Sequence, residues 1–349
     1  MKTPRRILIS PLDWGLGHAS RIIPLIDKHL ELGDNVIIAG SGMSLNLLKK
    51  QFPQLKSVEI PSFTMRYSAG KSQVWAVAKA FPSLIYYSIK EHKALKRIVE
   101  EEKITFIISD NRFGLYHKSV PSAYITHQLM IKLPHPWGFL EPFVAFVHRC
   151  IINKFTECWV PDFEKMSESL AGELSHPAKK PRNVKYIGTL SRFQLGVRSE
   201  ELGVSVQTSG EPSLLEFSRV QPEITSRASN LRNLALAILS GAEPQRSIFE
   251  DELLAKLQTY PHKNIILIQG KVEAEQKVSK VGKVTVYNYM NTEELQEYIL
   301  KADKIICRSG YSSIMDLHAL GKLQNATLIP TPGQTEQEYL AEYISNHIK

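Results

Sequence analysis

The stretch RILISPLDWGLGHASR at residues 6–21 decides the beginning of the fold. Its first five residues contain the apolar run Ile7, Leu8 and Ile9, as in a short buried strand, and a helical pattern of apolar residues starts at Ala19. Gly15 and Gly17 lie between the two, where a tight turn has to lead the chain from the strand into the helix. The stretch therefore predicts a strand-turn-helix unit, which is the building block of a parallel sheet covered by helices.

The same alternation of strands and helices continues to residue 189. Apolar runs predict strands at residues 6–10, 35–40, 57–62, 104–110, 122–128, 156–162 and 184–189. Helical patterns lie at residues 19–32, 43–52 and 73–102. We therefore expect residues 1–190 to form one Rossmann-like domain, because strands that alternate with helices form parallel sheets.

A second alternating region follows residue 233. Strands are predicted at residues 234–240, 264–269, 283–287, 304–307 and 326–330, and helices at residues 247–260, 292–302, 312–320 and 334–346. Residues 191–233 are rich in Ser, Gly, Glu, Pro and Arg, so we expect a linker or an insertion there. The expected architecture is α/β, with two Rossmann-like domains, 1–190 and 234–349, that face a central cleft. Ligands of such sheets bind at the carboxyl ends of the strands.

Charge and composition exclude several classes of protein. The 349 residues carry a net charge of +8, and residues 1–190 hold 26 Lys and Arg against 16 Asp and Glu. The first half is therefore expected to prefer anions. The three cysteines are not clustered, which argues against a disulfide framework or a zinc site. The chain has no recognised nucleic-acid motif, no leader and no membrane-spanning run, so we expect a cytoplasmic protein without a nucleic-acid partner.

The turn after the first predicted strand carries a candidate general base. His18 follows the glycine turn, and Asp110 ends the predicted strand at 104–110, so both are expected at the cleft. A carboxylate that orients a histidine makes it an effective base, which favours a pair of His18 and Asp110. Asp13 is the rival base, and helix capping by His18 or by Asp110 is the structural alternative. The residues expected on the acceptor side are Gly15, Gly17 and His127.

The loop after the predicted strand at 234–240 has the features of a phosphate site. Ser240 and Gly241 precede a predicted helix, whose N-terminal amides and dipole attract anions. Arg246 adds a positive charge to this loop. The alternative is that Gly241 only closes the turn that leads into the helix.

Three further stretches of the second half occur in the order of a known family. They are VYNYM at 286–290, ADKIICRSGYSSIMD at 302–316 and PTPGQTEQEYLA at 330–341. In this order, and at these places between strands and helices, they resemble the donor half of MurG-like glycosyltransferases, over residues 234–346. The glycine turn with His18 resembles the acceptor half more loosely. The resemblance implies a GT-B fold, a family 28 C-terminal domain and a UDP-sugar donor on the second domain.

The resemblance also implies roles for individual residues on the donor side. The expected donor-binding residues are Ser240, Gly241, Arg246, Tyr289, Met290, Arg308, Ser309, Gly310, Tyr311, Ser312, Asp316, Glu336 and Gln337. Among them, Tyr289 and Met290 match positions that contact uracil. The turn at 308–310 matches one that faces the diphosphate together with the start of the helix that follows it.

The remaining matches concern the two sugar rings of the donor. Asp316 stands where the family usually has a glutamate on the ribose hydroxyls, so this side chain is shorter than in the relatives. Glu336 and Gln337 match a pair that binds hydroxyls of the transferred sugar. The loop at Ser240 departs from the relatives, which are richer in glycine there.

The chemistry expected from this resemblance is sugar transfer with inversion. No Asp-x-Asp metal motif occurs in the chain, so we expect neither a metal nor a cofactor, with helix ends, amides and arginine stabilising the leaving UDP. The resemblance favours N-acetylglucosamine as the sugar, with other hexoses such as galactose as alternatives. The positive charge of the first half fits a lipid-linked or cell-envelope glycan as the acceptor. The alternatives are an enzyme like the UDP-N-acetylglucosamine 2-epimerases and a non-catalytic protein that binds nucleotide sugars.

A predicted helix after Pro142 carries an apolar stripe with a basic end. The stripe consists of Phe143, Phe146, Val147, Cys150, Ile151 and Lys154. Core packing is one explanation, because most apolar stripes face the interior. Together with the positive charge of the first half, the stripe also favours peripheral binding to an anionic surface at the inner face of the cell membrane.

Overall fold

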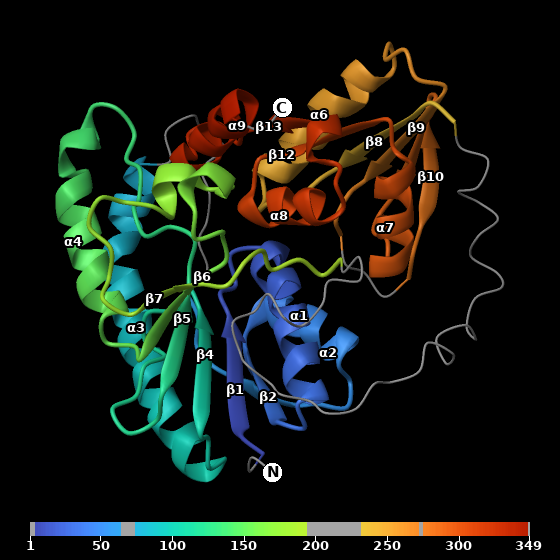
Figure 1. Ribbon diagram of the computed structural model, residues 1–349. Coiled ribbons are helices and arrows are strands. Elements are labelled where there is room, and N and C mark those ends of the chain that lie inside the picture. The colour runs from blue at the N-terminus through green and yellow to red at the C-terminus, as the bar shows by residue number, and fades with distance from the viewer. Residues whose placement is uncertain (1–3, 64–73, 194–231, 272–274, 348–349) are drawn as a thin grey trace.

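The computed structural model of the protein describes residues 4–63, 74–193, 232–271 and 275–347. These residues form two α/β domains, each built around a sheet and stacked one on the other (Figure 1). The fold class predicted from the sequence is therefore confirmed. Residues 194–231 of the predicted linker lie outside the described part of the chain.

Seven parallel strands in the described part of the chain form the first sheet, in the order β3-β2-β1-β4-β5-β6-β7. Their bounds are β1 Arg6–Pro11, β2 Asn35–Gly40, β3 Lys56–Glu59, β4 Phe106–Asp110, β5 Ser122–Ile125, β6 Glu157–Val160 and β7 Val184–Tyr186. The strand order reverses between β1 and β4, which are neighbours in this sheet. Such a reversal opens a crevice at the carboxyl ends of the strands, where α/β sheets bind ligands.

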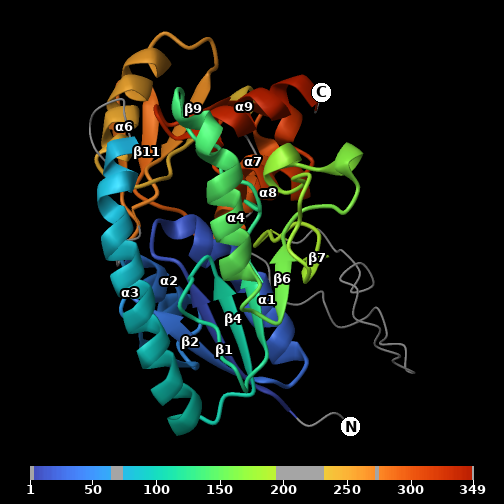
Figure 2. The same ribbon diagram turned by 90° about the vertical axis from the view of Figure 1, so that its left-hand side faces the viewer.

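Helices cover both faces of this sheet, because side chains alternate between the faces along each strand. Ile7 and Ile9 of β1 share a core cluster with α1 (Leu16–Glu31) and α2 (Gly42–Gln51). Leu8, between them, packs instead with apolar residues of α3 (Val74–Glu101). The helix α4 (Glu141–Ile152) packs with β5 and β6. Figure 2 shows α3 and α4 together on one face of the sheet.

Six strands of the described residues form the second sheet, in the order β10-β11-β9-β8-β12-β13. Their bounds are β8 Leu234–Ile238, β9 Asn264–Ile268, β10 Val278–Val281, β11 Val284–Tyr287, β12 Lys304–Arg308 and β13 Ala326–Ile329. The helices are α6 Gln245–Leu257, α7 Thr292–Lys301, α8 Tyr311–Ala319 and α9 Thr335–His347. Short 3-10 helices span Trp137–Leu140, Met166–Glu168, Gly172–Leu174 and Leu323–Asn325. The edge strand β10 runs antiparallel to β11, while the other described pairs of this sheet are parallel.

The two domains share buried apolar surface and hydrogen bonds. Leu174 of the first domain and Leu340 of α9 belong to one continuous cluster of buried residues. Tyr343 of α9 donates a hydrogen bond to the Ser169 carbonyl oxygen at 3.2 Å, and Tyr339 accepts one from the Glu173 amide at 2.8 Å. The helix α9 at the end of the chain therefore packs against the first domain and helps to hold the two sheets in one orientation.

Several differences between predicted and observed elements matter for the site. The helix α1 begins at Leu16, three residues earlier than predicted, because Gly15 is its N-cap. The strand β5 ends at Ile125, so residues 126–128 form a loop in place of the predicted end of the strand. The strand β10 was not predicted, since its residues are all exposed and lack a core pattern. No helix among the described residues has the length and apolarity needed to cross a bilayer.

Candidate active site between the domains

A cavity of about 1830 Å³ lies between the two domains and is lined by residues of both. From the first domain, Gly17, Asn111 and His127 line it, each following a strand of the parallel sheet. From the second domain, Gly241 and Gly310 line it after β8 and β12. The carboxyl ends of both sheets therefore meet at one cavity, as expected for ligand sites of α/β sheets.

The glycine turn lets the first turns of α1 and α8 approach each other. Gly15 has a φ of +140°, a value that side chains rarely tolerate. At Gly17 a Cβ atom would lie 2.8 Å from the Ser312 hydroxyl oxygen, so the Ser312 side chain would have to shift to admit one. That hydroxyl donates a hydrogen bond to the Gly17 carbonyl oxygen at 3.1 Å. The structure thus gives Gly17, predicted on the acceptor side, an interdomain contact with a predicted donor residue.

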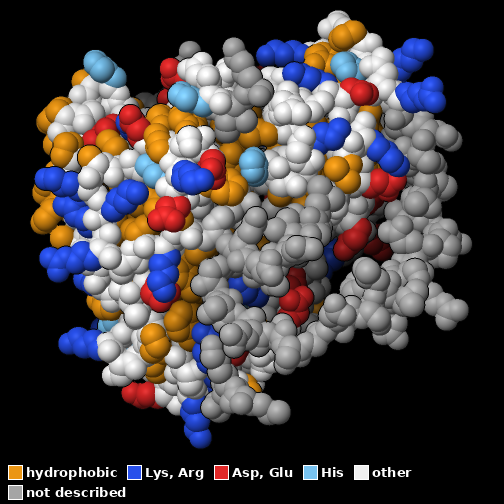
Figure 3. All heavy atoms as spheres, viewed as in Figure 1, with side chains coloured by type: hydrophobic (Ala, Val, Ile, Leu, Met, Phe, Trp, Pro, Cys, Tyr) orange, Lys and Arg blue, Asp and Glu red, His pale blue; other side chains and the backbone are white. Residues whose placement is uncertain are grey.

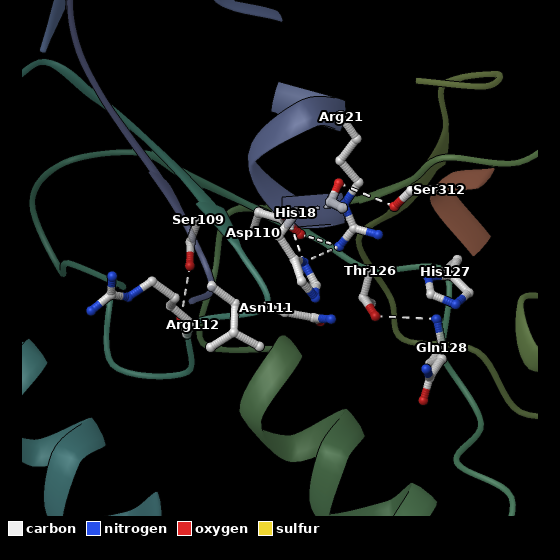
Figure 4. A network of polar contacts seen from close by, with 12 residues as sticks. His18, Arg21, Ser109, Asp110, Asn111, Arg112, Thr126, His127, Gln128 and Ser312 are labelled. Carbon is white, nitrogen blue, oxygen red and sulfur yellow. Dashed lines mark hydrogen bonds and ion pairs between the residues drawn. The ribbon is translucent and has the colours of Figure 1, made fainter. Parts of the chain in front are cut away.

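His18 and Asp110 form the hydrogen bond that the sequence suggested. The distance between His18 Nδ1 and Asp110 Oδ2 is 3.0 Å (Figure 4). Asp110 ends β4 and is fully buried, whereas the side chain of His18 is 20% exposed and lines the cavity. Neither residue caps a helix in the way the alternative required, since His18 lies within α1 and Asp110 pairs with groups of that helix. Their part in a reaction stays a prediction.

Arg21 completes this network and was not predicted. It lies one turn after His18 on α1, and its Nε donates to Asp110 Oδ2 at 2.9 Å. Its Nη2 donates to Asp110 Oδ1 and lies 2.9 Å from His18 Nδ1. Burial alone would raise the pKa of Asp110, but the charge of Arg21 and the hydrogen bonds of both partners lower it below the usual value. The spacing of three residues along a helix is the signal that identifies Arg21 as a neighbour of His18.

Asp13, the predicted rival base, lies elsewhere. Its Oδ1 accepts a hydrogen bond from the Ser44 amide at 3.1 Å, in the first turn of α2. This carboxylate therefore satisfies an orphan amide at a helix N-terminus, which is a structural role. Asp13 is not among the described residues that line the cavity. The structure does not place it as a base.

A second histidine joins the two domains. His127 Nε2 lies 2.8 Å from Glu336 Oε1, and the His127 ring stacks on Tyr311 with 4.0 Å between ring centroids. Burial lowers the pKa of His127 below its usual value. Burial would raise the pKa of Glu336, but the contact with His127 lowers it. A neutral His127 therefore donates to an ionised Glu336, and the predicted acceptor-side and donor-side residues meet in one interdomain contact.

The loop after β8 lines the cavity, and the charge of its arginine is partly balanced. Ser240 and Gly241 line the cavity, and Gly241 has a φ of +104°. The guanidinium of Arg246 donates to the Gln269 carbonyl oxygen at 3.0 Å and pairs with Glu243. It also lies 3.5 Å from a carboxylate oxygen of Glu250. Arg246 itself lines the cavity, and Glu243 and Glu250 balance part of its charge, so its contact with a phosphate stays a prediction.

The side chains of Arg308 and Ser309 bind groups of their own domain. Arg308 is nearly fully buried, and its Nη1 donates to the Pro330 carbonyl oxygen at 2.8 Å. Its guanidinium carbon lies 3.7 Å from the centroid of the Phe249 ring. The hydroxyl of Ser309 donates to the Gln337 carbonyl oxygen at 2.7 Å. Neither Arg308 nor Ser309 is among the described residues that line the cavity, whereas Gly310 of the same turn is, so a role of these two side chains in donor binding stays a prediction.

The other predicted donor residues do line the cavity. They are Tyr289, Met290, Gly310, Tyr311, Ser312, Asp316, Glu336 and Gln337. Asp316 accepts a hydrogen bond from the Ser191 hydroxyl at 2.6 Å, and burial raises its pKa. Gln337 Oε1 accepts one from the Thr331 amide at 2.9 Å. The Nζ of Lys50, from the first domain, lies 4.6 Å above the ring of Tyr289. This part of the cavity presents aromatic, amide and carboxylate groups from the second domain.

Asn111 is a further cavity residue that sequence reasoning missed. It directly follows Asp110 and has a φ of +56°, a left-handed conformation in which Asn is enriched. Its Oδ1 accepts a hydrogen bond from the buried Tyr124 hydroxyl at 3.0 Å. His148 Nε2 lies 3.5 Å from the same hydroxyl, and burial lowers the pKa of His148 to about 4. An Asn directly after a strand end was the signal in the sequence.

Some residues of the predicted apolar stripe on α4 are exposed to solvent. Phe143 is 65% exposed and Phe146 is 53% exposed, so core packing is wrong for these two residues. Val147 and Ile151, on the same helix, line the cavity together with Phe143. Figure 3 shows apolar side chains interspersed with Lys and Arg at the edge of the molecule where α3 and α4 lie. An exposed apolar patch thus continues into the cavity.

We name this surface the α3–α4 patch. It groups the exposed apolar residues of α3, of the 3-10 helix Trp137–Leu140 and of α4, which are Ile85, Tyr86, Ile89, Trp137, Phe139, Phe143 and Phe146. Lys90 lies over the ring of Tyr86, with 4.5 Å from its Nζ to the ring centroid, and Arg149 lies over Phe146 at 5.6 Å. The patch therefore combines aromatic rings with basic groups, as surfaces that contact membranes or protein partners do.

The second domain matches a known family in sequence. Residues 233–349 match the sequence profile of the glycosyltransferase family 28 C-terminal domain. No curated protein is significantly similar in sequence to the chain. The family match thus covers the region in which the sequence resembled the donor half of glycosyltransferases.

Solved structures are similar over nearly the whole chain. A UDP-glucosyltransferase from Polygonum tinctorium, in complex with 3,4-dichloroaniline, is 12% identical with a TM-score of 0.58, covering 100% of this chain and 84% of its own. An Arabidopsis thaliana protein in complex with UDP-L-rhamnose is 13% identical with a TM-score of 0.54, covering 99% and 83%. A Listeria monocytogenes protein assigned as a UDP-N-acetylglucosamine 2-epimerase is 10% identical with a TM-score of 0.52, covering 99% and 88%. The chain thus has the GT-B fold, and its second domain matches a glycosyltransferase family.

Proposed function

We propose that the chain is an inverting glycosyltransferase that moves a sugar from a UDP-sugar to a hydroxyl of a lipid-linked or cell-envelope glycan. N-acetylglucosamine is the sugar we expect first. The observation that carries the proposal is the 3.0 Å hydrogen bond between His18 and Asp110 in a cavity between the domains of a GT-B fold. The match of residues 233–349 to a glycosyltransferase family supports it.

The proposed reaction is a single displacement at the anomeric carbon. His18 Nε2 removes the proton of the acceptor hydroxyl, while Nδ1 donates a hydrogen bond to Asp110. The acceptor oxygen forms a bond to the anomeric carbon as the bond between that carbon and the UDP oxygen breaks. Attack on the side opposite the leaving group inverts the configuration. A positioned general base of this kind accelerates transfer by about 10²–10⁴-fold.

We propose that main-chain groups of the second domain stabilise the leaving UDP. Gly310, Tyr311 and Ser312 line the cavity at the N-terminus of α8, where amides without helical partners attract negative charge. Ser240 and Gly241 add a second loop of this kind. The side chains of Arg246 and Arg308 are engaged with protein groups, which supports a donor site built from backbone amides.

We propose an amphiphilic acceptor that reaches the cavity from the α3–α4 patch. Phe143 belongs to the exposed patch and also lines the cavity, as do Val147 and Ile151 behind it. The positive charge of the first 190 residues favours an anionic lipid surface beside this opening. In this arrangement the lipid part of the acceptor stays in or near the bilayer, while its hydroxyl reaches His18.

Measurement of UDP release from nucleotide sugars tests the proposed function. UDP-N-acetylglucosamine, UDP-glucose and UDP-galactose would be incubated with and without a lipid extract, in the presence of EDTA. We expect release that depends on the lipid acceptor and persists with the chelator. Release of the same size without any acceptor would favour an epimerase or a hydrolase, and tight binding without release would favour a non-catalytic protein.

Vesicle co-sedimentation tests the membrane part separately. We expect binding to vesicles that contain phosphatidylglycerol, weaker binding to pure phosphatidylcholine, and release by salt, because basic groups lie among the exposed aromatic residues. A Phe143→Ser, Phe146→Ser variant should bind several-fold less with unchanged thermal stability, since both side chains are mostly exposed. If the bound fraction did not change with lipid charge, salt or these substitutions, the result would contradict a membrane-binding surface on α4.

A further inference from the structure

The buried charge beside His18 has two possible counter-ions. Asp110 is fully buried, and an isolated buried carboxylate either finds a positive partner or takes up a proton. One candidate partner is a protonated His18, whose Nδ1 lies 3.0 Å from Asp110 Oδ2. The other is the guanidinium of Arg21, which is always charged. Which of the two balances Asp110 decides whether His18 is able to accept a proton.

The geometry favours Arg21 as the counter-ion. Its Nε and Nη2 bind the two oxygens of Asp110 side by side, which is the paired arrangement in which guanidinium and carboxylate interact most strongly. Both side chains are nearly inaccessible to water, so the pair is not weakened by solvent. The carboxylate charge is therefore already neutralised before His18 takes any part.

We propose that Arg21 is a positioning residue that serves as the permanent counter-ion of Asp110, so that His18 stays neutral, donates its Nδ1 hydrogen to Asp110 and presents an unprotonated Nε2 to the cavity. What Nε2 then does rests on the proposed transferase function. Figure 4 shows Arg21 and His18 converging on Asp110, with the second ring nitrogen of His18 on the side away from the carboxylate. The assignment of the Nδ1 hydrogen rests on the same function, although the ring can be observed without any substrate.

The contacts of His18 Nδ1 allow two states of this nitrogen that exclude each other. Nδ1 lies 2.9 Å from Arg21 Nη2, and a guanidinium only donates hydrogen bonds. A ring nitrogen has either a hydrogen for Asp110 or a lone pair for Arg21. We assign the hydrogen because an imidazolium that forms during proton transfer keeps the bond to Asp110, while a bond accepted from Arg21 would have to break.

The other charged groups that face His18 come from across the cleft. Glu336 of α9 and His127 of the loop after β5 both interact electrostatically with His18. They are hydrogen-bonded to each other at 2.8 Å, so the carboxylate of Glu336 is shared with its own histidine. Arg21 and Asp110 are therefore the charges in direct contact with the His18 ring.

Nitrogen NMR of the histidine rings tests the proposal without any substrate. The full-length protein would be labelled with ¹⁵N-histidine, and the His18 signals assigned by their loss in a His18→Gln variant. At pH 7 we expect one protonated nitrogen, Nδ1, and one unprotonated nitrogen, Nε2. In Arg21→Gln we expect both nitrogens to be protonated, because the imidazolium then replaces the missing counter-ion. A wild-type ring with Nε2 protonated, or an unchanged ring in Arg21→Gln, would overturn the proposal.

Two further variants keep the test decisive if Arg21→Gln does not fold. Arg21→Lys retains a positive charge without the paired geometry and should leave His18 neutral. The double variant Arg21→Gln, Asp110→Asn removes both charges and should also leave His18 neutral. A protonated His18 ring in either variant at pH 7 would contradict the counter-ion role of Arg21.

Kinetics then separates this role from a merely structural one. With UDP-N-acetylglucosamine and a lipid extract, Arg21→Gln should lose about tenfold or more in kcat at pH 7 and recover most of it at pH 9, because the imidazolium releases its proton there. Arg21→Lys should restore part of the rate at pH 7. A loss that is equal at all pH values would mean that Arg21 only supports the fold. If no transfer occurs in wild type while the NMR result holds, the proposed function fails and the inference stands.

Discussion

The two halves of the cavity use their buried arginines in different ways. In the first domain, Arg21 binds a carboxylate that in turn contacts His18 at the cavity. In the second domain, Arg246 and Arg308 bind carbonyl oxygens and carboxylates of their own domain. Arg21 therefore acts on a side chain that lines the cavity, while Arg246 and Arg308 mainly tie together parts of the second domain. A charged residue in a family motif is thus not by itself a ligand contact.

Replacement of His18 should give the largest effect and tests the first half of this comparison. His18→Ala should lower kcat for acceptor-dependent UDP release by about 10²–10⁴-fold, because the general base is lost. The melting temperature should change little, since the side chain lies at the cavity and is partly exposed. The matched variant is Asp13→Asn, which weakens the hydrogen bond to α2 and should keep most of the activity. Equal activity of wild type and His18→Ala would remove His18 as the base.

The stability of the first half should depend on pH through His148. Burial holds the folded pKa of His148 at about 4, below the usual 6.5, so the unfolded chain takes up a proton first as the pH falls. The contribution of a neutral His148 to the free energy of unfolding is therefore fully present above pH 6.5. It declines by about 3 kcal/mol between pH 6.5 and about 4. Urea denaturation at several pH values measures this slope. His148→Gln should flatten it, and a wild-type curve as flat as that of the variant would contradict a buried neutral His148.

Replacement of Arg308 tests the second half. Arg308→Met should lower the free energy of unfolding by about 1–3 kcal/mol, because buried carbonyl oxygens lose their donor and the stack on Phe249 loses its charge. Affinity for UDP, measured by calorimetry, should stay within about twofold. Arg308→Lys is the matched control: it retains the charge but not the planar fork, so it should also destabilise the protein. If Arg308→Met lost UDP binding and Arg308→Lys recovered it, the charge at this position would contact the donor.

The contact between the two halves should give the smallest effect. Gly17→Ala places a methyl carbon 2.8 Å from the Ser312 hydroxyl oxygen, which then has to move, and should destabilise the protein by roughly 1–2 kcal/mol. Ser312→Ala removes the oxygen that the methyl group meets. In urea denaturation, the double variant should therefore be less destabilised than the sum of the two single variants. Strict additivity would mean that α1 and α8 do not approach each other in solution.

Local pattern was enough to predict most of the framework. The boundaries of β2 agree with the prediction. His18 and Asp110 were expected together because one follows a strand and the other ends one at the same edge of the sheet. The edge strand β10 was not predicted, because its side chains are all exposed and show no alternation of buried and exposed residues. Arg21 was not predicted, although its spacing from His18 is visible in the sequence, because an arginine on a helix is ordinarily a surface charge and its burial against β4 appears only in the structure.

The sequence by itself determined the alternation of strands and helices, the glycine turn and the place of each polar residue along the chain, because these depend on neighbours a few positions apart. Tertiary structure alone decided where long side chains point. Asp13 accepts a hydrogen bond from the first turn of α2, Arg308 donates one to the Pro330 carbonyl oxygen, and Arg21 donates one to Asp110. A flexible charged side chain can reach several partners from one backbone position. In the folded protein it pairs with the group that best satisfies its charge where water is excluded.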